Sequence, residues 1–303
     1  MHAYLIMAHK NKEQLIILLK LLDYSENDIF IHIDKKANEE MKNINYQRYC
    51  KFSKVYCKSE INIKWGDVSQ IQTEILLLKM ARKYNKYSYY HLISGMDLPL
   101  KSQQQIHKFF DINEGKEFIN YSGKDKTAGM LIEDRVKYYW LTKYYDSLPS
   151  KKSRAIMHRI DKLQVVVQKL MNIDRLKKKN IKKIYHGAQW FSITDSLAME
   201  LINCEKEILE IFKYSYCSDE IFIQTYIKNN NWFKRLYSPK LDNGFKSIER
   251  NIDWNRGGPY TWKENDFDEL IKSNYLFARK FDQTIDFKII KLISDYVLTM
   301  GKE

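Results

Sequence analysis

Two adjacent carboxylates, Asp219 and Glu220, stand in the stretch C-S-D-E-I-F-I-Q-T, directly before an apolar run. Carboxylates in this position commonly begin a helix, because they face its unpaired N–H groups and the positive end of its dipole. A carboxylate beside a cleft can also take a proton from a reacting hydroxyl group. The pattern alone leaves both interpretations of the pair open, with Asp219 as a candidate helix cap.

Two further carboxylates stand at the ends of predicted strands, Asp34 in H-I-D-K-K and Asp97 in S-G-M-D-L-P-L-K. Each could accept hydrogen bonds from a ribose, base or sugar group, or could serve only its own turn. The chain has no G-x-G-x-x-G, no G-x-x-x-x-G-K-[ST] and no His/Cys/carboxylate set with metal-ligand spacing. Its single D-x-D, Asp266 to Asp268, precedes a helical pattern, and we predict that it begins that helix rather than binding manganese.

Strand and helix patterns alternate along the first part of the chain. Short apolar runs predict strands over 3–8, 28–34 and 87–95, and a longer strand-like stretch covers 55–67. Helical spacing predicts helices between them, and Ser102 is a candidate cap for the helix that follows it. The predicted helices cover 12–22, 68–83 and 103–110. This order indicates a parallel sheet, so residues 1–125 are interpreted as a nucleotide-binding half with its ligand beyond the carboxyl ends of the strands.

Composition limits the protein class. The chain has 303 residues, of which 44% are hydrophobic, so it can bury a large core. Its four cysteines have no repeated spacing, which favours a reducing compartment over a disulfide framework. No stretch approaches about 18 consecutive apolar residues, so we expect a cytoplasmic protein that does not span a membrane.

Most of the net charge of +13 lies in residues 150–184, where twelve Lys or Arg face two Asp, a local charge of +10. Five apolar residues in this segment recur at helical spacing, and two interpretations of this stripe remain open: it packs on the body of the protein, or it contacts anionic lipid. Nucleic acid is not expected, because the basic segment has no interleaved aromatic residues. The stripe consists of Ile156, Ile160, Leu163, Val167 and Leu170.

Six motifs together resemble the core-2/I-branching β-1,6-N-acetylglucosaminyltransferases, glycosyltransferase family 14, which also contains peptide O-xylosyltransferases. The similarity extends from about residue 3 to residue 287. It implies an α/β protein of the GT-A type, an α/β/α unit with a mixed, mostly parallel central sheet and, here, a basic helical insertion. It also implies a UDP-sugar at the sheet edge and inversion at the anomeric carbon without a metal. The motifs are I-F-I-H-I-D-K-K, W-G-D-V-S, H-L-I-S-G-M-D-L-P-L-K-S, H-G-A-Q-W-F-S-I-T, C-S-D-E-I-F-I-Q-T and N-Y-L-F-A-R-K-F-D.

Position by position, the resemblance makes Glu220 the catalytic base and Asp34 a nucleoside contact. Lys280, in A-R-K-F-D, and Arg256, in I-D-W-N-R-G-G-P, would hold the diphosphate, and Trp65 would lie near the nucleotide. We therefore predict that Glu220, Arg256 and Lys280 surround one pocket. The sugar and acceptor side of that pocket would be lined by Asp97, Gln189, Trp190 and Asp219.

The resemblance implies one catalytic domain, 1–303, with the nucleotide-binding half at 1–125, the basic insertion at 126–184 and an acceptor and diphosphate half at 185–303. The expected donor is UDP-GlcNAc, with UDP-xylose or another UDP-hexose as the alternative, and no cofactor is required. The expected acceptor is a saccharide, lipid-linked if residues 150–184 dock on an anionic membrane surface. The absence of the animal members' cysteines suggests a bacterial enzyme of surface polysaccharide synthesis at the inner face of the membrane. The competing hypothesis is a non-catalytic peripheral membrane protein whose α/β body is only a scaffold.

Overall fold

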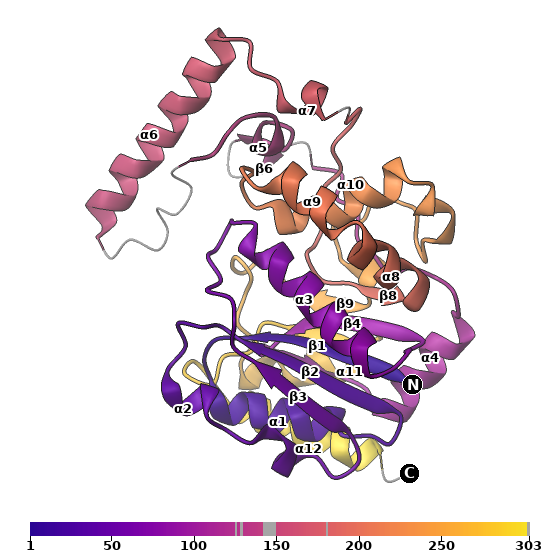
Figure 1. Ribbon diagram of the computed structural model, residues 1–303. Helices are drawn as coiled ribbons and strands as arrows, with labels where there is room; N and C mark the ends of the chain where they lie inside the picture. Colours follow the sequence, from indigo (N-terminus) through magenta and orange to yellow (C-terminus); the bar gives the residue numbers. More distant parts are fainter. Residues whose placement is uncertain (125, 128–129, 142–149, 180, 302–303) are drawn as a thin grey trace.

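The computed structural model describes residues 1–124, 126–127, 130–141, 150–179 and 181–301 (Figure 1). A five-stranded sheet runs through it in the order β3-β2-β1-β4-β8; the first four strands are parallel, and β8 is antiparallel to β4. The expected mixed, mostly parallel sheet is therefore confirmed. Its strands are β1 (His2–Ala8), β2 (Asn27–Ile33), β3 (Lys54–Lys58), β4 (Tyr89–Ser94) and β8 (Ser192–Thr194).

Helices cover both faces of this sheet, and side chains of β1 alternate between the two layers. Tyr4 and Ile6 pack in the core cluster that contains residues of α1 and α12, whereas Ala3 and Leu5 pack in the cluster that contains residues of α3 and α8. All four side chains are fully buried. The covering helices are α1 (Lys12–Leu22), α12 (Phe287–Met300), α3 (Ser69–Tyr84) and α8 (Asp195–Asn203).

The helix α4 (Gln103–Ile112) begins as expected. Ser102 Oγ accepts from the Gln105 N–H at 3.3 Å, and Gln105 Oε1 accepts from the Ser102 N–H at 3.0 Å, which makes a reciprocal capping box. Further short helices are α2 (Glu39–Lys42), α9 (Glu205–Phe212), α10 (Phe222–Asn229) and α11 (Phe267–Lys272). Described 3-10 turns are η1 (Tyr46–Tyr49), η3 (Ser218–Glu220), η4 (Trp232–Arg235), η5 (Lys246–Ile248) and η6 (Glu264–Asp266).

The strand predicted over 55–67 is wrong beyond Lys58, where β3 ends. The backbone N–H groups of Glu60 and Ile61 turn to His32 Nε2, at 3.3 and 3.1 Å, instead of continuing the ladder. The Ile63 N–H turns to Asp34 Oδ1 at 3.4 Å. Side chains at the end of β2 therefore take over the donors that a longer strand would have used.

A second sheet joins distant parts of the chain. β10 (Phe277–Arg279) lies between β5 (Asp97–Pro99), to which it is antiparallel, and β9 (Arg250–Ile252), to which it is parallel. Its register sets Arg279 opposite Asp97. The residues that follow β4 are thus tied to residues near the C-terminus.

The basic segment contains a long helix, α6 (Lys151–Leu170), which stands at the edge of the molecule above the sheet (Figure 1). The interpretation that its apolar stripe packs on the body is wrong, because all five stripe residues are between 38% and 79% exposed. The opposite face, with Asp161, Val165 and Gln168, is the buried one. Around it lie β6 (Lys126–Thr127), β7 (Met130–Leu131), α5 (Asp134–Lys137) and α7 (Arg175–Lys178).

Within the described residues, no helix combines the length and the apolar character needed to span a bilayer.

Candidate active site

Glu220 ends the turn η3, and its carboxylate meets two basic side chains. Arg135 Nη1, from α5, donates to Glu220 Oε2 over 3.1 Å, and His186 Nε2 lies 3.4 Å from the same oxygen. The Glu220 side chain remains 37% exposed. A carboxylate that is fixed through one oxygen and partly exposed can present its other oxygen to a reacting hydroxyl group.

Asp219 and Glu220 have pKa values that diverge. Burial, together with the neighbouring charge of Glu220, raises the pKa of Asp219 to about 7. Burial also opposes ionisation of Glu220, but the hydrogen bond and charge of His186, with those of Arg135, lower the pKa of Glu220 below its usual value. Glu220 is therefore the ionised member of the pair near neutral pH, which is the state a general base requires.

The expected helix cap by Asp219 is wrong. Neither η3 nor α10 has a side-chain cap, because Cys217 adopts a left-handed conformation (φ 46°) and the chain enters a 3-10 turn first. The Asp219 side chain is buried and points instead to α3, where Gln70 Nε2 donates to its Oδ2 over 2.9 Å. Asp219 thus anchors the turn to α3 and leaves Glu220 on the open side.

The loop that carries His186 depends on a glycine. A Cβ on Gly187 would lie 1.8 Å from the carbonyl oxygen of Asn120, so only glycine fits this approach. The Gly187 N–H donates to the Glu220 carbonyl oxygen at 2.9 Å, and the Ala188 N–H donates to Asn120 Oδ1 at 3.0 Å. These bonds place His186 beside Glu220.

Gln189 continues this loop toward α3 and the end of β1. Its Nε2 donates to Glu74 Oε1 over 2.8 Å and lies 3.8 Å from Met7 Sδ. Glu74 is fully buried, and burial raises its pKa well above the usual value. The Gln189 amide therefore links α3 to the carboxyl end of β1.

Asp97 and Trp190 meet through Arg279. Arg279 Nη1 donates to Asp97 Oδ1 over 2.7 Å, and its guanidinium carbon lies 4.3 Å from the centre of the Trp190 ring. The second Asp97 oxygen accepts from the Ser94 N–H at 2.9 Å, so this carboxylate also serves its own turn. Asp97 and Trp190 are both buried.

Positive side chains gather where β1 and β2 end. The pKa of His9 is lowered by burial and then by the charges of Lys10, Lys280 and Lys36, while Asp34 opposes this effect. The pKa of Lys280 is likewise lowered by burial, by Lys10 and by Arg279. Asp34 is buried and accepts from the Lys36 N–H at 3.1 Å, which is turn chemistry.

An open hollow of about 350 Å³ lies at this edge. Its lining includes Lys10, Lys12 and Lys36 together with Glu13 and Glu40, and it lies at the sheet edge expected for a nucleotide. A second hollow, of about 480 Å³, lies between α3 and α9 and is lined by Asp67, Trp140 and neighbouring residues. Neither of these two hollows is bordered by Glu220, Arg256 or Lys280.

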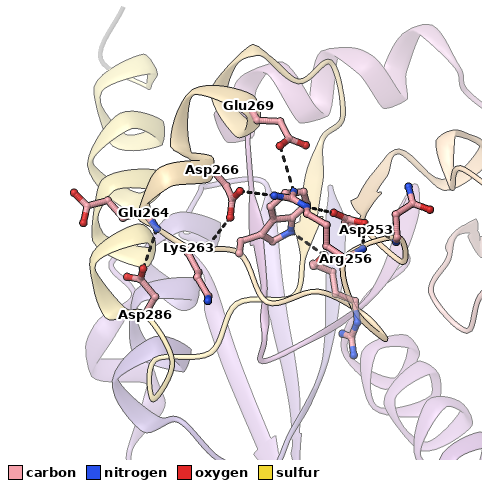
Figure 2. A network of polar contacts seen from close by, with 10 residues as sticks. Asp253, Arg256, Lys263, Glu264, Asp266, Glu269 and Asp286 are labelled. Atoms are coloured by element: carbon pink, nitrogen blue, oxygen red, sulfur yellow. Dashed lines mark hydrogen bonds and ion pairs between the residues drawn. The ribbon is translucent and has the colours of Figure 1, made fainter.

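Arg256 is held by three carboxylates, as Figure 2 shows. Its guanidinium contacts Asp253, donates to Asp266 Oδ1 over 2.7 Å and lies 3.3 Å from Glu269 Oε2. Hydrogen bonds to Asp253 and Asp266 raise the pKa of Arg256 further above its usual value. Its positive charge is thus balanced by its own surroundings.

Arg256 nevertheless lies near the backbone of Lys280. Its guanidinium carbon is 4.2 Å from the centre of the Tyr260 ring and 5.2 Å from that of Trp262. The Tyr260 carbonyl accepts from the Lys280 N–H at 3.4 Å, and the Trp262 N–H donates to the Lys280 carbonyl at 2.9 Å. Two aromatic residues therefore connect Arg256 with Lys280.

The D-x-D residues begin a helix, as expected. Asp266 ends η6 directly before α11, and Asp268 lies in the first turn of α11. Asp266 accepts from Arg256 through Oδ1 and from the Lys263 N–H, over 2.8 Å, through Oδ2. Both of its oxygens are engaged (Figure 2).

Trp65 is 58% exposed, on a loop that packs on the chain just before η3. Gly66 has a φ of +71°, and its carbonyl accepts from the Cys217 N–H at 2.9 Å. The Trp65 ring meets the Tyr216 ring edge to face, with 5.8 Å between centres. These contacts place Trp65 beside the turn that carries Glu220, while no hydrogen bond in the described part of the chain joins it to Asp34.

The contacts link most of the expected site residues into a row, with Glu220 at one end and Lys280 at the other. His186, Gln189 and Trp190 on one loop connect Glu220 to Arg279, which precedes Lys280. Sequence reasoning missed Arg135, His186 and Arg279, although the last two lie inside the motifs H-G-A-Q-W and A-R-K-F-D. Arg135 lies outside the six motifs, so no motif marks it as a site residue.

Comparison with known proteins identifies the relatives of this chain. The model of the core-2/I-branching enzyme family matches residues 2–271. The chain is 20% identical over 320 residues to xylosyltransferase 2 of Rattus norvegicus, covering 96% of this chain and 33% of the relative. It is 21% identical to "Beta-1,3-galactosyl-O-glycosyl-glycoprotein beta-1,6-N-acetylglucosaminyltransferase 4" of Danio rerio, covering 97% and 68%. The chain thus spans about a third of the length of the xylosyltransferase relatives.

Solved structures show weaker likeness. Mouse xyloside xylosyltransferase 1 aligns over 92% of this chain and 97% of its own, with 8% identity and a TM-score of 0.38. Residues 1–349 of S. aureus TarS, in complex with UDP-GlcNAc, align over 46% of this chain and 39% of their own, with 14% identity and a TM-score of 0.29. The family match covers most of the chain and agrees with the observed sheet, so the expected GT-A type α/β fold is confirmed. The chain belongs to the core-2/I-branching enzyme family.

Proposed function

We propose that the protein is an inverting glycosyltransferase that moves a sugar from a UDP-sugar to a hydroxyl group of a saccharide acceptor. In this reaction the acceptor oxygen attacks the anomeric carbon and the bond from that carbon to the diphosphate breaks. The acceptor proton passes to Glu220, and UDP leaves with the electron pair of the broken bond. A single displacement produces inversion, so one base is sufficient and no covalent intermediate forms.

The observation that carries this proposal is the setting of Glu220. Its carboxylate is kept ionised by Arg135 and His186, yet its side chain is more than a third exposed. An ionised and partly exposed carboxylate has the protonation state and the access that a base needs to accept a proton from a substrate. Positioned bases of this type contribute roughly 10²–10⁴-fold to rates.

The charge on departing UDP requires fixed cations. We propose Lys280 for this role, because it lies near Lys10 and Arg279, and because it forms no salt bridge within the described residues. Cations that are already in place stabilise developing charge without reorganisation, so the proposed reaction needs no metal. We retain Arg256 as the second cation, with the condition that diphosphate replaces part of its present carboxylate shell.

We propose Asp34 for the nucleoside end, with Trp65 beside the donor, and Asp97, Gln189, Trp190 and Asp219 around the sugar and acceptor. Our first choice of donor is UDP-GlcNAc and the alternative is UDP-xylose, since the named relatives include transferases of both sugars. We further propose an acceptor carried at an anionic membrane surface, as in the assembly of a surface polysaccharide.

The test is a panel of UDP-sugars with UDP release as the readout, together with the melting temperature in the presence of UDP. Ligand at ~100 times its Kd adds about 2.7 kcal/mol to the free energy of unfolding. We expect UDP to raise the melting temperature and one UDP-sugar to be turned over preferentially. If UDP has no effect on melting and no UDP-sugar is consumed, the body is a non-catalytic scaffold and the proposal is wrong.

A further inference from the structure

The helix α6 turns its apolar side away from the protein. Ile156, Ile160, Leu163, Val167 and Leu170 lie on one face, and each is at least 38% exposed. Surface helices of globular proteins normally show the reverse arrangement, with the apolar stripe toward the core. A contiguous exposed apolar stripe of this kind marks an interaction surface.

Polar contacts on the opposite face fix this orientation. Gln168 exchanges two hydrogen bonds with the backbone of Tyr139: its Oε1 accepts from the N–H at 2.8 Å and its Nε2 donates to the carbonyl at 2.9 Å. Lys169 Nζ donates to Asp134 Oδ2 over 2.9 Å. Rotating α6 to bury the stripe would break these contacts, so the outward stripe belongs to the folded state.

The charge beside the stripe selects the partner. Lys152, Arg159 and Lys162 flank the stripe on one side at helical spacing, and none of them makes a salt bridge within the described residues. An apolar face bordered by cations is the composition of helices that lie in a bilayer interface. A second copy of this chain would instead bring the same cations face to face, because a twofold interface sets a patch against itself.

We propose that α6 is an interfacial docking helix that inserts its outward stripe into an anionic lipid bilayer, with Lys152, Arg159 and Lys162 at the headgroup level. This inference rests on the anionic surface already proposed for the acceptor, and it names the helix that would bring the protein to that surface. The buried side of α6 also reaches the active-site turn. Val165 packs in one apolar cluster with Trp140 and Cys217, and Cys217 directly precedes η3.

The inference is tested by co-sedimentation of the full chain with vesicles of phosphatidylcholine alone or of phosphatidylcholine with phosphatidylglycerol. We expect binding only to the anionic vesicles, and weaker binding as the Debye length falls from about 10 Å at 0.1 M salt to about 3 Å at 1 M. Replacing Lys152, Arg159 and Lys162 with Gln should weaken binding by roughly fivefold for each cation removed. A double variant in the stripe, Leu163→Asp with Val167→Asp, should abolish binding to the anionic vesicles.

The matched control is Ile112→Asp, which changes an exposed apolar residue on α4. We expect this variant to bind vesicles like the unaltered chain, and all variants to keep the melting shift with UDP. Equal binding to neutral vesicles, or no loss in the Leu163→Asp with Val167→Asp variant, would overturn the inference. A dimer seen by light scattering and lost in that variant would overturn it in favour of an interface between copies. If the protein binds anionic vesicles but UDP does not raise its melting temperature, the docking inference holds and the transferase proposal is wrong.

Discussion

The chemistry of single residues centres on how two neighbouring carboxylates are kept in different protonation states. Arg135 and His186 both act on Oε2 of Glu220, while Asp219 is buried against Gln70 and receives no cation of its own at hydrogen-bond distance in the described contacts. The negative charge of the pair is thus concentrated on the exposed member. Transfer of a proton from a substrate to Glu220 would return the pair to a neutral state.

Replacing Glu220 with Gln should abolish most of the turnover. Gln keeps the size and the hydrogen-bonding capacity of the side chain but cannot accept the proton, so we expect the rate to fall by roughly 10²-fold or more. UDP-sugar binding should stay near normal when measured by calorimetry. Glu207→Gln on α9 is the matched control and should retain full activity, since Glu207 is exposed. Transfer at the unaltered rate by Glu220→Gln would show that another group is the base.

Asp219 should make the stability of the protein depend on pH. Its pKa is raised from 3.8 to about 7, chiefly by burial and by the charge of Glu220, with Arg135 and Gln70 opposing. Between these two values the folded chain binds a proton that the unfolded chain has lost, so the free energy of unfolding should fall as pH rises through this window. Asp219→Asn cannot ionise and should lose this slope.

Urea denaturation at pH 5 and pH 8 measures the effect of Asp219→Asn. We expect the variant to gain stability relative to the unaltered chain as pH rises. Glu74 and Glu220 remain in both proteins, so their own titration largely cancels in the comparison. A stability difference that is the same at both pH values would mean that Asp219 has an ordinary pKa.

At the scale of elements, the parts that sequence could predict are those in which burial follows from the pattern itself. β1, β2 and β4 are fully or almost fully buried parallel strands, and such strands appear as continuous apolar runs. The cap at Ser102 was predictable because its partner stands three residues away. Local signals of this type do not depend on the rest of the fold.

The missed features depend on contacts between distant residues. Periodicity showed that α6 has an apolar stripe but could not show on which side the body lies; Asp134 and Tyr139 decide that. Arg135 reaches Glu220 across 85 residues, and no local pattern marks such a partner. The prediction that Asp219 caps a helix was wrong for the same reason, because its actual partner, Gln70, is 149 residues away.

The start of α12 should depend on one carboxylate. Asp286 Oδ1 accepts from the N–H groups of Lys288 and Ile289 at 2.9 and 3.1 Å. Its Oδ2 accepts from the Glu264 N–H at 2.8 Å (Figure 2). Asp286→Ala removes both acceptor oxygens and the three hydrogen bonds that they accept, and we expect it to lower the free energy of unfolding by about 1–2 kcal/mol. Urea denaturation measures the change, and Asp295→Ala, exposed on the same helix, should cost little. An equal loss in both variants would indicate helix propensity rather than a lost cap.

At the scale of the whole molecule, positive charge is present both at the proposed donor site and on the basic segment. The chain carries +13 in total. Lys10, Arg279 and Lys280 lie near one another at the sheet edge, and the cations of α6 lie on the protruding helix. A donor with a diphosphate and an anionic membrane would thus meet two separate positive regions.

Chelation should leave the proposed reaction intact. In our proposal fixed cations stabilise the departing UDP, and Asp266 in the D-x-D motif already accepts two hydrogen bonds. We expect UDP release from the preferred UDP-sugar to continue at an unchanged rate in EDTA. Loss of activity in EDTA that is restored by Mn²⁺ would show that the cationic model is wrong.

The pairing of β5 with β10 also determines when the site can form during synthesis. Asp97 and Arg279 are separated by 182 residues, so the ion pair between them cannot exist until all of the chain up to Arg279 has left the ribosome. At ~5–20 residues per second, this delay is roughly 10–35 s, which is long compared with the formation of local helices. The strands β1 to β4 can associate during that time, whereas the edge at which we place the donor waits for the C-terminus. Any nascent chain released before Arg279 has been added would therefore carry a formed sheet without a completed pocket.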